Sequence, residues 1–306
     1  MSGKLRGYLE VPGTAVRIPY TRLEGKAPGM RLLVTGGVHG GEYPGIEAAI
    51  RLAGRLDPDR LRGLVTVIHL ANPPAFYSKT QYVVPLDGKN LNRAFPGNPG
   101  GSPTERMAHA VFEVARTHDA WIDLHGGDIH EALLPFVIYS AEGGPVVARR
   151  AKVMAEAYGI PTLVESDAIE GAGYAVAARH RLAAILAEAG QVGQLDETSV
   201  VRHVDGVFRV LVALGMLAAP DAVTPPAEAV DVYTRNLWVR APVDGFQYPA
   251  VRVGDTVREG QICCRIRNEW GELQAECAAP AQGRVLFHAT SLAINAGDPL
   301  FAVIAR

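Results

Sequence analysis

"RLLVTGGVHGGEYPGIEAAIRL", residues 31–52, joins a predicted strand to a predicted helix through a glycine-rich turn. The apolar run at residues 31–35 is typical of a buried strand, and the apolar residues after Pro44 recur at helical spacing. Glycines at positions 36, 37, 40 and 41 let the backbone turn sharply between the two. A strand that leads directly into a helix begins a βαβ unit, so the stretch predicts an α/β protein.

The same alternation of strands and helices continues to about residue 197. Further apolar strand candidates lie at residues 64–72, 120–125, 134–140 and 182–190, and amphipathic helix candidates lie at residues 103–117 and 144–159. A final helix is expected over residues 199–217. Short buried strands that alternate with helices predict a doubly wound, mostly parallel sheet with helices on both faces.

The last quarter of the chain differs from the rest in composition and periodicity. Residues 219–232 are rich in alanine and proline without periodicity, which indicates a connection between domains, so we expect one domain over residues 1–225 and a second over 232–306. Residues 241–266 resemble residues 279–304, with Ala-Pro and a glycine repeated 38 positions apart. Two such halves predict a small all-β barrel-sandwich domain. The tail resembles a lipoyl or biotinyl carrier domain, but its central hairpin, residues 268–280, lacks the lysine that would carry a prosthetic group.

Composition narrows the class of protein. The chain has 306 residues, 48 % of them hydrophobic, and its 30 basic and 32 acidic residues leave a net charge of -2. No basic run predicts a nucleic-acid or membrane partner, and no apolar segment predicts a signal peptide or a membrane span, so a cytoplasmic protein is expected. The three cysteines, at positions 263, 264 and 277, lack the spacing of a structural zinc site and are expected to be reduced thiols. The oligomeric state, including a homo-oligomer, stays open.

Two glycine-flanked histidines stand at predicted strand ends. His39 and Glu42 follow the first strand, and His125 ends the strand at residues 120–125. In open α/β sheets, ligands bind at the carboxyl ends of the strands, so these side chains are expected to converge. Two imidazoles and one carboxylate form the ligand set of catalytic zinc sites that leave a fourth position for water. The sequence therefore predicts one Zn²⁺ per chain, held by these three residues.

Plainer interpretations exist for the same residues. A histidine and a glutamate three positions apart are often surface residues, and His125 could be a hydrogen-bonded histidine at a strand end. Asp123 lies two residues before His125, and hence on the same face of the strand, where it would orient the imidazole of the ligand or form a buried salt bridge.

Glu188 is the candidate general base. It closes an apolar strand just before Gly190, where a carboxylate beside a catalytic water could accept and return a proton. A strand-end carboxylate that points to solvent is the alternative. Glu165 is a rival base in a more polar segment.

A polar, turn-rich loop at residues 83–101 separates the two ligand motifs and is expected to be functional because of its length. Arg93 offers a planar guanidinium for a carboxylate or a developing oxyanion, and Asn90 and Asn92 offer amides beside it. Alternatively, the asparagines form turns and Arg93 is a surface charge.

Together these motifs resemble the succinylglutamate desuccinylase and aspartoacylase family, a branch of the zinc carboxypeptidase-like fold. GGVHGGEYPG matches its first ligand motif, DLHGG its second, NLNRAFPG its substrate loop and the EAG at Glu188 its base motif. The resemblance implies zinc bound by His39, Glu42 and His125, catalysis by Glu188 and Arg93, and substrate binding by Asn92 and Arg93, beside which Asn90 stays a candidate from the loop itself. It identifies residues 1–225 as a zinc-dependent catalytic domain.

The implied reaction is hydrolysis of the amide bond in a small N-acyl amino acid. Aspartoacylase-type members have a further arginine upstream of the Asn-Arg pair, where this chain offers Gln81 or Lys79, and Gln81 is taken as the substrate-binding candidate. The longer loop is closer to the bacterial branch of N-acetyl-diaminobutyrate deacetylases. Tyr174, Arg179, His180 and Arg181 supply further candidates for the substrate carboxylate, or simply a helix with a basic face.

Two other functions fit the same residues. A metallocarboxypeptidase of the same broad fold would remove a C-terminal residue from peptides. A non-catalytic binding protein would keep the fold without a metal, and would tolerate the change Glu188→Gln.

Overall fold

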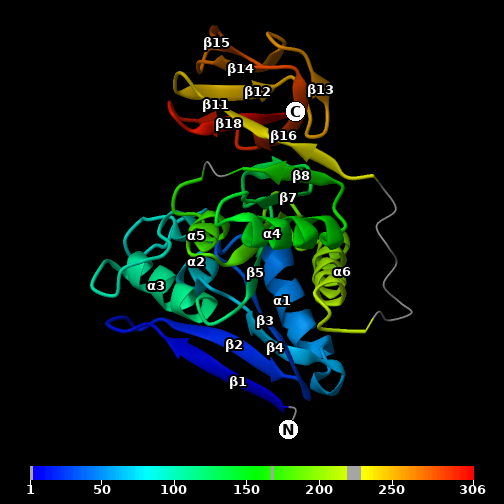
Figure 1. The fold of residues 1–306 in the computed structure, drawn as a ribbon. Helices are drawn as coiled ribbons and strands as arrows, with labels where there is room; N and C mark the ends of the chain where they lie inside the picture. The colour runs from blue at the N-terminus through cyan, green and yellow to red at the C-terminus, as the bar shows by residue number, and fades with distance from the viewer. Residues whose placement is uncertain (1–2, 167–168, 219–228) are drawn as a thin grey trace.

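The computed structural model of the chain describes residues 3–166, 169–218 and 229–306. Within these residues, nine strands form one sheet in the order β1-β2-β4-β3-β5-β9-β7-β8-β10 (Figure 1). The strands are β1 Gly3–Glu10, β2 Arg17–Glu24, β3 Ala27–Gly36, β4 Arg62–Ile68, β5 Ala120–His125, β7 Phe136–Tyr139, β8 Thr162–Glu165, β9 Ala183–Glu188 and β10 Asp231–Tyr233. The strands expected from the sequence between residues 31 and 190 are all present.

Among the described residues this sheet is mostly parallel, as expected, but it is mixed: five of its eight strand pairings are parallel and three are antiparallel. The central run β4-β3-β5-β9 is parallel, and so are β7-β8 and β8-β10. However, β7 runs antiparallel to β9, and the N-terminal hairpin β1-β2 adds antiparallel pairings at one edge. The sequence pattern missed this hairpin because most residues of β1 are exposed and the strand shows no regular apolar alternation.

Helices cover both faces of the sheet, as predicted. Helices α1 Tyr43–Arg55, α4 Pro145–Tyr158 and α6 Glu197–Ala213 pack on one face, whereas α3 Pro103–Ala115 and α5 Gly173–Arg179 pack on the other. The short helix α2 Pro73–Ser78 and two 3₁₀ turns, Pro58–Arg60 and Leu91–Arg93, complete the connections. Strand β5 shows why both faces are apolar: Ile122 and Leu124 face α1, and Trp121 faces α5. Asp123 and His125 share the face of Trp121.

The C-terminal region contains two antiparallel sheets within the described residues. One has the order β11-β18-β16-β13, and the other has the order β15-β14-β12-β17. The strands are β11 Arg235–Arg240, β12 Gly245–Pro249, β13 Thr256–Val257, β14 Ile262–Arg267, β15 Leu273–Ala278, β16 Gly283–Ala289, β17 Ala293–Ile294 and β18 Pro299–Ala305. Their shared core includes the buried free thiols of Cys263, Cys264 and Cys277. The predicted domain boundary falls largely on residues 219–228, which lie outside the described residues.

One short strand connects the two regions. Strand β6, Glu131–Leu133, follows the loop after β5 and pairs antiparallel with β16 of the C-terminal sheet. The backbone amides of Leu134 and Thr290 extend this pairing with hydrogen bonds to Leu286 and His130, both 2.8 Å long. In Figure 1 the C-terminal sheets accordingly sit at the β7-β8 end of the α/β body, opposite the β1-β2 hairpin.

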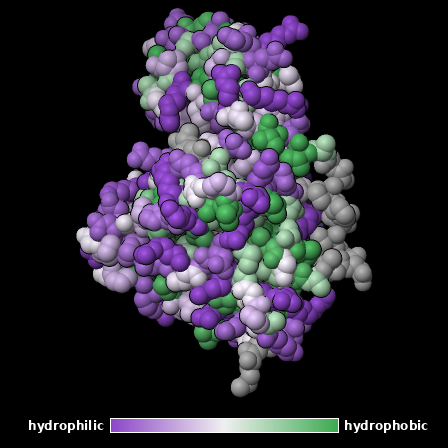
Figure 2. Space-filling model, viewed as in Figure 1, coloured by the Kyte–Doolittle hydropathy of each residue, from purple (hydrophilic) through white to green (hydrophobic). Residues whose placement is uncertain are grey.

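The surface is mostly hydrophilic on the face that Figure 2 shows, with hydrophobic side chains interspersed. Some of the exposed apolar residues belong to helices, among them Ile50, Val146 and Val201. In the described ranges, every helix is too short or too polar to span a lipid bilayer.

Candidate active site

The turn after β3 brings His39 and Glu42 to the edge of the large sheet. Close contacts explain its glycines: a Cβ on Gly40 would lie 2.3 Å from the backbone nitrogen of Phe76, and one on Gly41 would lie 2.0 Å from Oδ1 of Asp128. Helix α1 then begins at Tyr43, with proline in its first turn. Both His39 and Glu42 are buried.

His125 reaches the same place from the next strand. Strands β3 and β5 are parallel neighbours with Gly36 opposite Leu124, so their carboxyl ends meet. Glu42 lies between the two imidazoles: its Oε1 is 2.6 Å from Nδ1 of His39, and its Oε2 is 2.9 Å from Nδ1 of His125. One ligand atom from each residue lies within 4.8 Å of the others. The structure therefore brings the three predicted ligands together.

The donor set fits a metal ion. Glu42 Oε2 is buried, yet it makes no hydrogen bond of acceptable geometry with any described residue, although it is close to His125. Burial alone raises the pKa of Glu42, but His125 and His39 lower it to about 2. A permanently ionised carboxylate between two imidazole nitrogens, all buried, is an arrangement that a divalent cation such as zinc would satisfy.

The outer nitrogens of both imidazoles are held in place. Asp123 Oδ2 lies 3.0 Å from Nε2 of His125, and Asp123 in turn accepts a hydrogen bond from the hydroxyl of Thr35. Asn90 Oδ1 lies 3.0 Å from Nε2 of His39. Burial lowers the pKa of His125, but the carboxylates of Glu42 and Asp123 outweigh burial and raise it. Asp123 thus stands where an orienting carboxylate is expected.

Glu188 ends β9, the next parallel strand, and it lies opposite His125 in register. Its carboxylate lines the same cavity, and Oε2 is buried without a hydrogen-bond partner among the described residues. Burial, reinforced by the nearby charge of Glu42, raises the pKa of Glu188 well above its usual value. The rival Glu165 does not line the cavity, and its carboxylate accepts a 2.8 Å hydrogen bond from the hydroxyl of Tyr139.

The loop between the ligand motifs lies against the cavity through its 3₁₀ turn. Asn90 Oδ1 accepts a 2.8 Å hydrogen bond from the amide of Asn92, and Asn92 Oδ1 accepts one of 3.0 Å from the amide of Gly173 at the start of α5. Both asparagines therefore fix the loop as well as line the cavity. Arg93 also lines the cavity, and burial is the main cause that lowers its pKa.

Gln81 is not among the cavity-lining residues, whereas its neighbour Tyr82 is. Tyr82 has a positive φ of 58°, and its backbone amide donates a 2.9 Å hydrogen bond to Asp128. Its ring packs edge-on against His39 with centroids 5.8 Å apart. The structure thus places Tyr82 in the cavity wall, where the sequence had suggested Gln81.

The cavity has a volume of about 500 Å³ and a wall from the C-terminal region. Alternate residues of β11 contribute to this wall: Asn236, Trp238 and Arg240. Sequence reasoning missed these three, together with Tyr82, Asp128 and Glu131. The polar-apolar alternation in RNLWVR was a usable signal for β11, but nothing in the sequence placed that strand near His39.

Among its described residues, helix α5 contributes Tyr174 to the lining of this cavity. Arg179 forms a 2.8 Å ion pair with Glu142, and His180 packs edge-on against Phe112. Arg179 and His180 line a separate hollow, although Arg93 lies beside both hollows.

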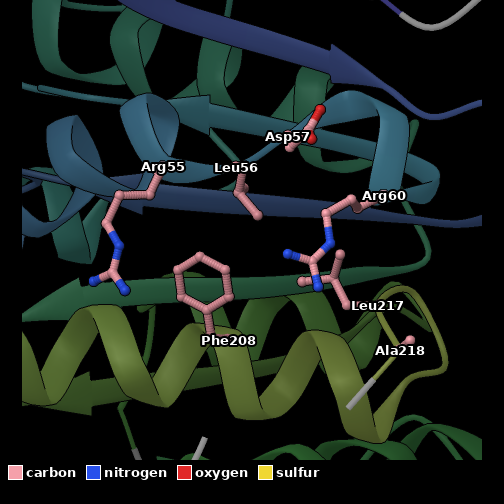
Figure 3. A pocket seen from close by; sticks show the side chains of 7 residues that line it. All are labelled: Arg55, Leu56, Asp57, Arg60, Phe208, Leu217 and Ala218. Atoms are coloured by element: carbon pink, nitrogen blue, oxygen red, sulfur yellow. The ribbon is translucent and has the colours of Figure 1, made fainter. Parts of the chain in front are cut away.

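Another hollow, of about 310 Å³, lies between the end of α1 and α6 (Figure 3). Its described lining consists of Arg55, Leu56, Asp57, Arg60, Phe208, Leu217 and Ala218. The guanidinium of Arg55 lies 5.1 Å from the ring centroid of Phe208, a cation-π contact that stabilises the helix pair. Asp57 is the acidic residue of this described lining, which contains no histidine, cysteine or glutamate.

Comparisons with known proteins agree with this geometry. The N-alpha-acetyl-L-2,4-diaminobutyric acid deacetylase of Halomonas elongata is 30 % identical over 320 residues, which cover 99 % of this chain and 92 % of that protein. The product-bound ectoine utilization protein EutE (DoeB) of Ruegeria pomeroyi superposes with a TM-score of 0.88 at 25 % identity, and covers 100 % of this chain and 96 % of its own. A succinylglutamate desuccinylase/aspartoacylase from Rhodobacter sphaeroides gives a TM-score of 0.86 at 26 % identity with the same coverage.

The family model for the succinylglutamate desuccinylase/aspartoacylase catalytic domain matches residues 28–214. This range begins in β3 and ends just after α6, so it includes His39, Glu42, His125 and Glu188. The resemblance noted in the sequence motifs is therefore confirmed: the chain belongs to the succinylglutamate desuccinylase/aspartoacylase family.

Proposed function

We propose that the protein is a zinc-dependent deacylase that hydrolyses the amide bond of a small N-acyl amino acid. The observation that carries the proposal is the convergence of His39, Glu42 and His125 with the buried carboxylate of Glu188 in one cavity. In this proposal residues 1–225 form the catalytic domain, and residues 232–306 form a β domain that completes the cavity wall.

His39, Glu42 and His125 would hold the zinc ion, which when bound polarises water and the scissile carbonyl group. Glu188 accepts a proton from the attacking water and delivers it to the amide nitrogen as the carbon-nitrogen bond breaks. The products are a carboxylic acid from the acyl group and a free amine. Burial raises the pKa of Glu188, which favours the return of the proton to the amide nitrogen.

Arg93 faces the negative charge that develops on the acyl oxygen during attack. Its Nη1 donates a 2.7 Å hydrogen bond to the carbonyl oxygen of Asn92, which fixes one edge of the guanidinium. Among the described residues, no carboxylate forms an ion pair with Arg93. Its other donors are available to a ligand.

Arg240 is the second arginine in the cavity, and we assign it to the free carboxylate of the substrate. Its Nη1 donates a 2.8 Å hydrogen bond to the carbonyl oxygen of Gly297, and no described acidic side chain pairs with it. Burial is the main cause that lowers the pKa of Arg93, and the like charge of Arg240 adds to it. Two mutually repelling cations in one cavity favour an anionic ligand between them.

The size of the cavity favours a small substrate over a peptide. A volume of about 500 Å³ lies in the range of small-molecule sites, and Trp238 of β11 stands in its wall. The similarity to the Halomonas elongata deacetylase makes Nα-acetyl-L-2,4-diaminobutyrate the first substrate to test.

The test compares substrates on the purified, zinc-loaded protein. N-acetyl amino acids, including Nα-acetyl-L-2,4-diaminobutyrate and N-acetyl-L-aspartate, are assayed beside short peptides, with release of the free amine as the readout. We expect hydrolysis of at least one acetylated amino acid, and loss of it after chelation. Activity confined to peptides would point to the carboxypeptidase. No bound zinc and no hydrolysis would point to the binding protein.

A further inference from the structure

Glu131 is a charged residue of the cavity for which the proposed hydrolysis has no use. It is the first residue of β6 and pairs with Ala289 of the C-terminal sheet, so it lies where the two regions meet. The hydroxyl of Tyr82 donates to its Oε1, and the amide of Asp128 donates a 2.9 Å hydrogen bond to its Oε2. Both neighbours hold the side chain in one position at the cavity wall.

This carboxylate has no direct ion pair among the described residues, although the guanidinium of Arg93 attracts it. Among the described residues, no lysine or arginine forms an ion pair with Glu131, and both of its hydrogen-bond donors are neutral. Burial raises the pKa of Glu131 to about 7, which reflects the cost of a largely buried anion. Each carboxylate oxygen accepts more than one hydrogen bond, so the group can bind a further donor. An ammonium group would supply both the donor and a directly paired charge.

The surroundings of Glu131 suit an alkylammonium group. Leu133, two residues further along β6, lines the same cavity and lies opposite Phe287 of β16. The ring of Phe287 contacts that of Trp238, with centroids 5.0 Å apart. Apolar and aromatic side chains beside a carboxylate accommodate a methylene chain that ends in a cation.

The other charged residues of the cavity either have an assigned role or are exposed to solvent. Arg93 and Arg240 attract an anion, Glu42 belongs to the metal ligands, and Glu188 is needed as the base. Glu170 also lines the cavity, but it is exposed at the rim, where solvent screens its charge. Glu131 is therefore the carboxylate that is both held in place and unassigned.

We propose that Glu131 binds a positively charged amino group on the side chain of the substrate, and so selects N-acyl diamino acids over neutral or acidic N-acyl amino acids. The inference rests on the proposed deacylase function and adds a second charge to the substrate: a carboxylate at the arginines and an ammonium at Glu131. Glu131 is a specificity-determining residue in this scheme, and it takes no part in bond breaking.

The experiment compares two substrates of nearly equal shape. Nα-acetyl-L-2,4-diaminobutyrate carries the side-chain ammonium, and N-acetyl-L-norvaline has a methyl group in its place. For the wild-type protein we expect kcat/KM to be about 10- to 100-fold higher for the diamino substrate. In Glu131→Gln that preference should fall to within about 3-fold of unity, with kcat/KM for the norvaline substrate nearly unchanged. Zinc content should also be unchanged.

Matched variants separate recognition from support of the fold. Glu170→Gln removes a carboxylate from the rim and should keep the preference. Tyr82→Phe removes one of the two hydrogen bonds that hold Glu131 and leaves the one from the Asp128 amide, so most of the preference should remain. If Glu131→Gln lowers kcat/KM equally for both substrates, or changes neither, Glu131 does not recognise the ammonium group of the substrate and the inference is wrong.

The wild-type protein gives an answer that does not depend on the variant folding. If it hydrolyses N-acetyl-L-norvaline as well as the diamino substrate, the inference fails while the deacylase proposal stands. If the zinc-loaded protein hydrolyses neither these nor any other N-acyl amino acid, the proposed function itself fails.

Discussion

Glu188 on β9 lies directly opposite His125 on β5 in the parallel register of the large sheet. The two side chains belong to residues 63 positions apart in the chain, yet the register of one strand pair places them together at the same sheet edge. A shift of one residue would turn one of them to the opposite face of the sheet. The relation between a candidate metal ligand and the candidate base is therefore built into the core of the protein.

The ligand assignment predicts that His39→Ala loses both zinc and activity. The remaining histidine and carboxylate provide too few ligands for a stable zinc site. Metal analysis of the purified variant, with the circular dichroism spectrum as a check on folding, measures the effect. His69→Gln is the matched control, because His69 lies outside the cavity and is hydrogen-bonded to Thr21. Full zinc content in His39→Ala would disprove the assignment.

For the base, we expect Glu188→Gln to keep its zinc while turnover falls at least ~10²-fold, since proton transfer is lost but the ligands stay. Steady-state kinetics on the substrate found in the screen provides the measurement. Glu165→Gln serves as control, because Glu165 bonds to Tyr139 and does not line the cavity. Equal losses in both variants, or a loss only in Glu165→Gln, would assign the base to another residue.

Asp123→Asn should weaken zinc binding about 10- to 100-fold without removing any ligand. The carboxylate of Asp123 lies 3.0 Å from Nε2 of His125. A neutral amide accepts a weaker hydrogen bond from this nitrogen, so it holds the imidazole less firmly in the orientation that binds zinc. Competition with a chelator of known affinity gives the dissociation constant. An unchanged constant would mean that Asp123 serves the fold through Thr35 alone.

Arg240→Gln should raise KM about 10-fold or more and leave kcat within a few-fold, because a contact to the substrate carboxylate acts on binding before and during the reaction. Arg235→Gln is a close control, since Arg235 is an exposed residue of the same strand and does not line the cavity. If both variants behave alike, the carboxylate lies elsewhere.

The stability of the protein should fall between pH 6.5 and pH 4, partly because of His118. Burial lowers its pKa from 6.5 to about 4, so between these values the unfolded chain binds a proton that the folded chain does not. This contribution is present above pH 6.5 and is lost as the pH decreases. Its Nδ1 donates to the carbonyl oxygen of Val114, and its Nε2 lies 2.8 Å from the hydroxyl of Thr66, which can donate to the neutral ring; the Nδ1 bond is also 2.8 Å long.

The measurement is the melting temperature at pH 7 and at pH 4.5 for the wild-type protein and for His118→Asn. Over this pH interval the free energy of unfolding of the wild-type protein should fall by about 2 kcal/mol more than that of the variant, which appears as a larger drop in its melting temperature. Parallel losses would show that His118 titrates similarly in both states.

The site residues that belong to short local patterns could be predicted from the sequence, whereas those brought in from distant elements could not. His39 and Glu42 share a turn, and His125 and Glu188 each end an apolar strand, so short patterns sufficed to find them. Tyr82 contacts Glu131, which is 49 residues away, and Trp238 reaches the cavity from the C-terminal region. Such contacts depend on how separate elements pack, and no local periodicity encodes that.

The fold likewise has parts that the sequence predicts and parts that it does not. Strand β5 was predictable because six consecutive residues are buried. The direction of β7 was not, because the loop after β5 includes β6 and returns the chain antiparallel to β9. Apolar content reports burial, but it does not report strand direction.

The position of β18 has a consequence for how the enzyme comes into being. This strand, residues 299–305, lies between β11 and β16 in the sheet that holds Trp238 and receives β6. On the ribosome, a nascent chain that has emerged only through α6 already contains the metal ligands but lacks this central strand. The cavity wall that holds Trp238 should therefore be completed late in synthesis, when residues 299–305 insert between their two neighbours.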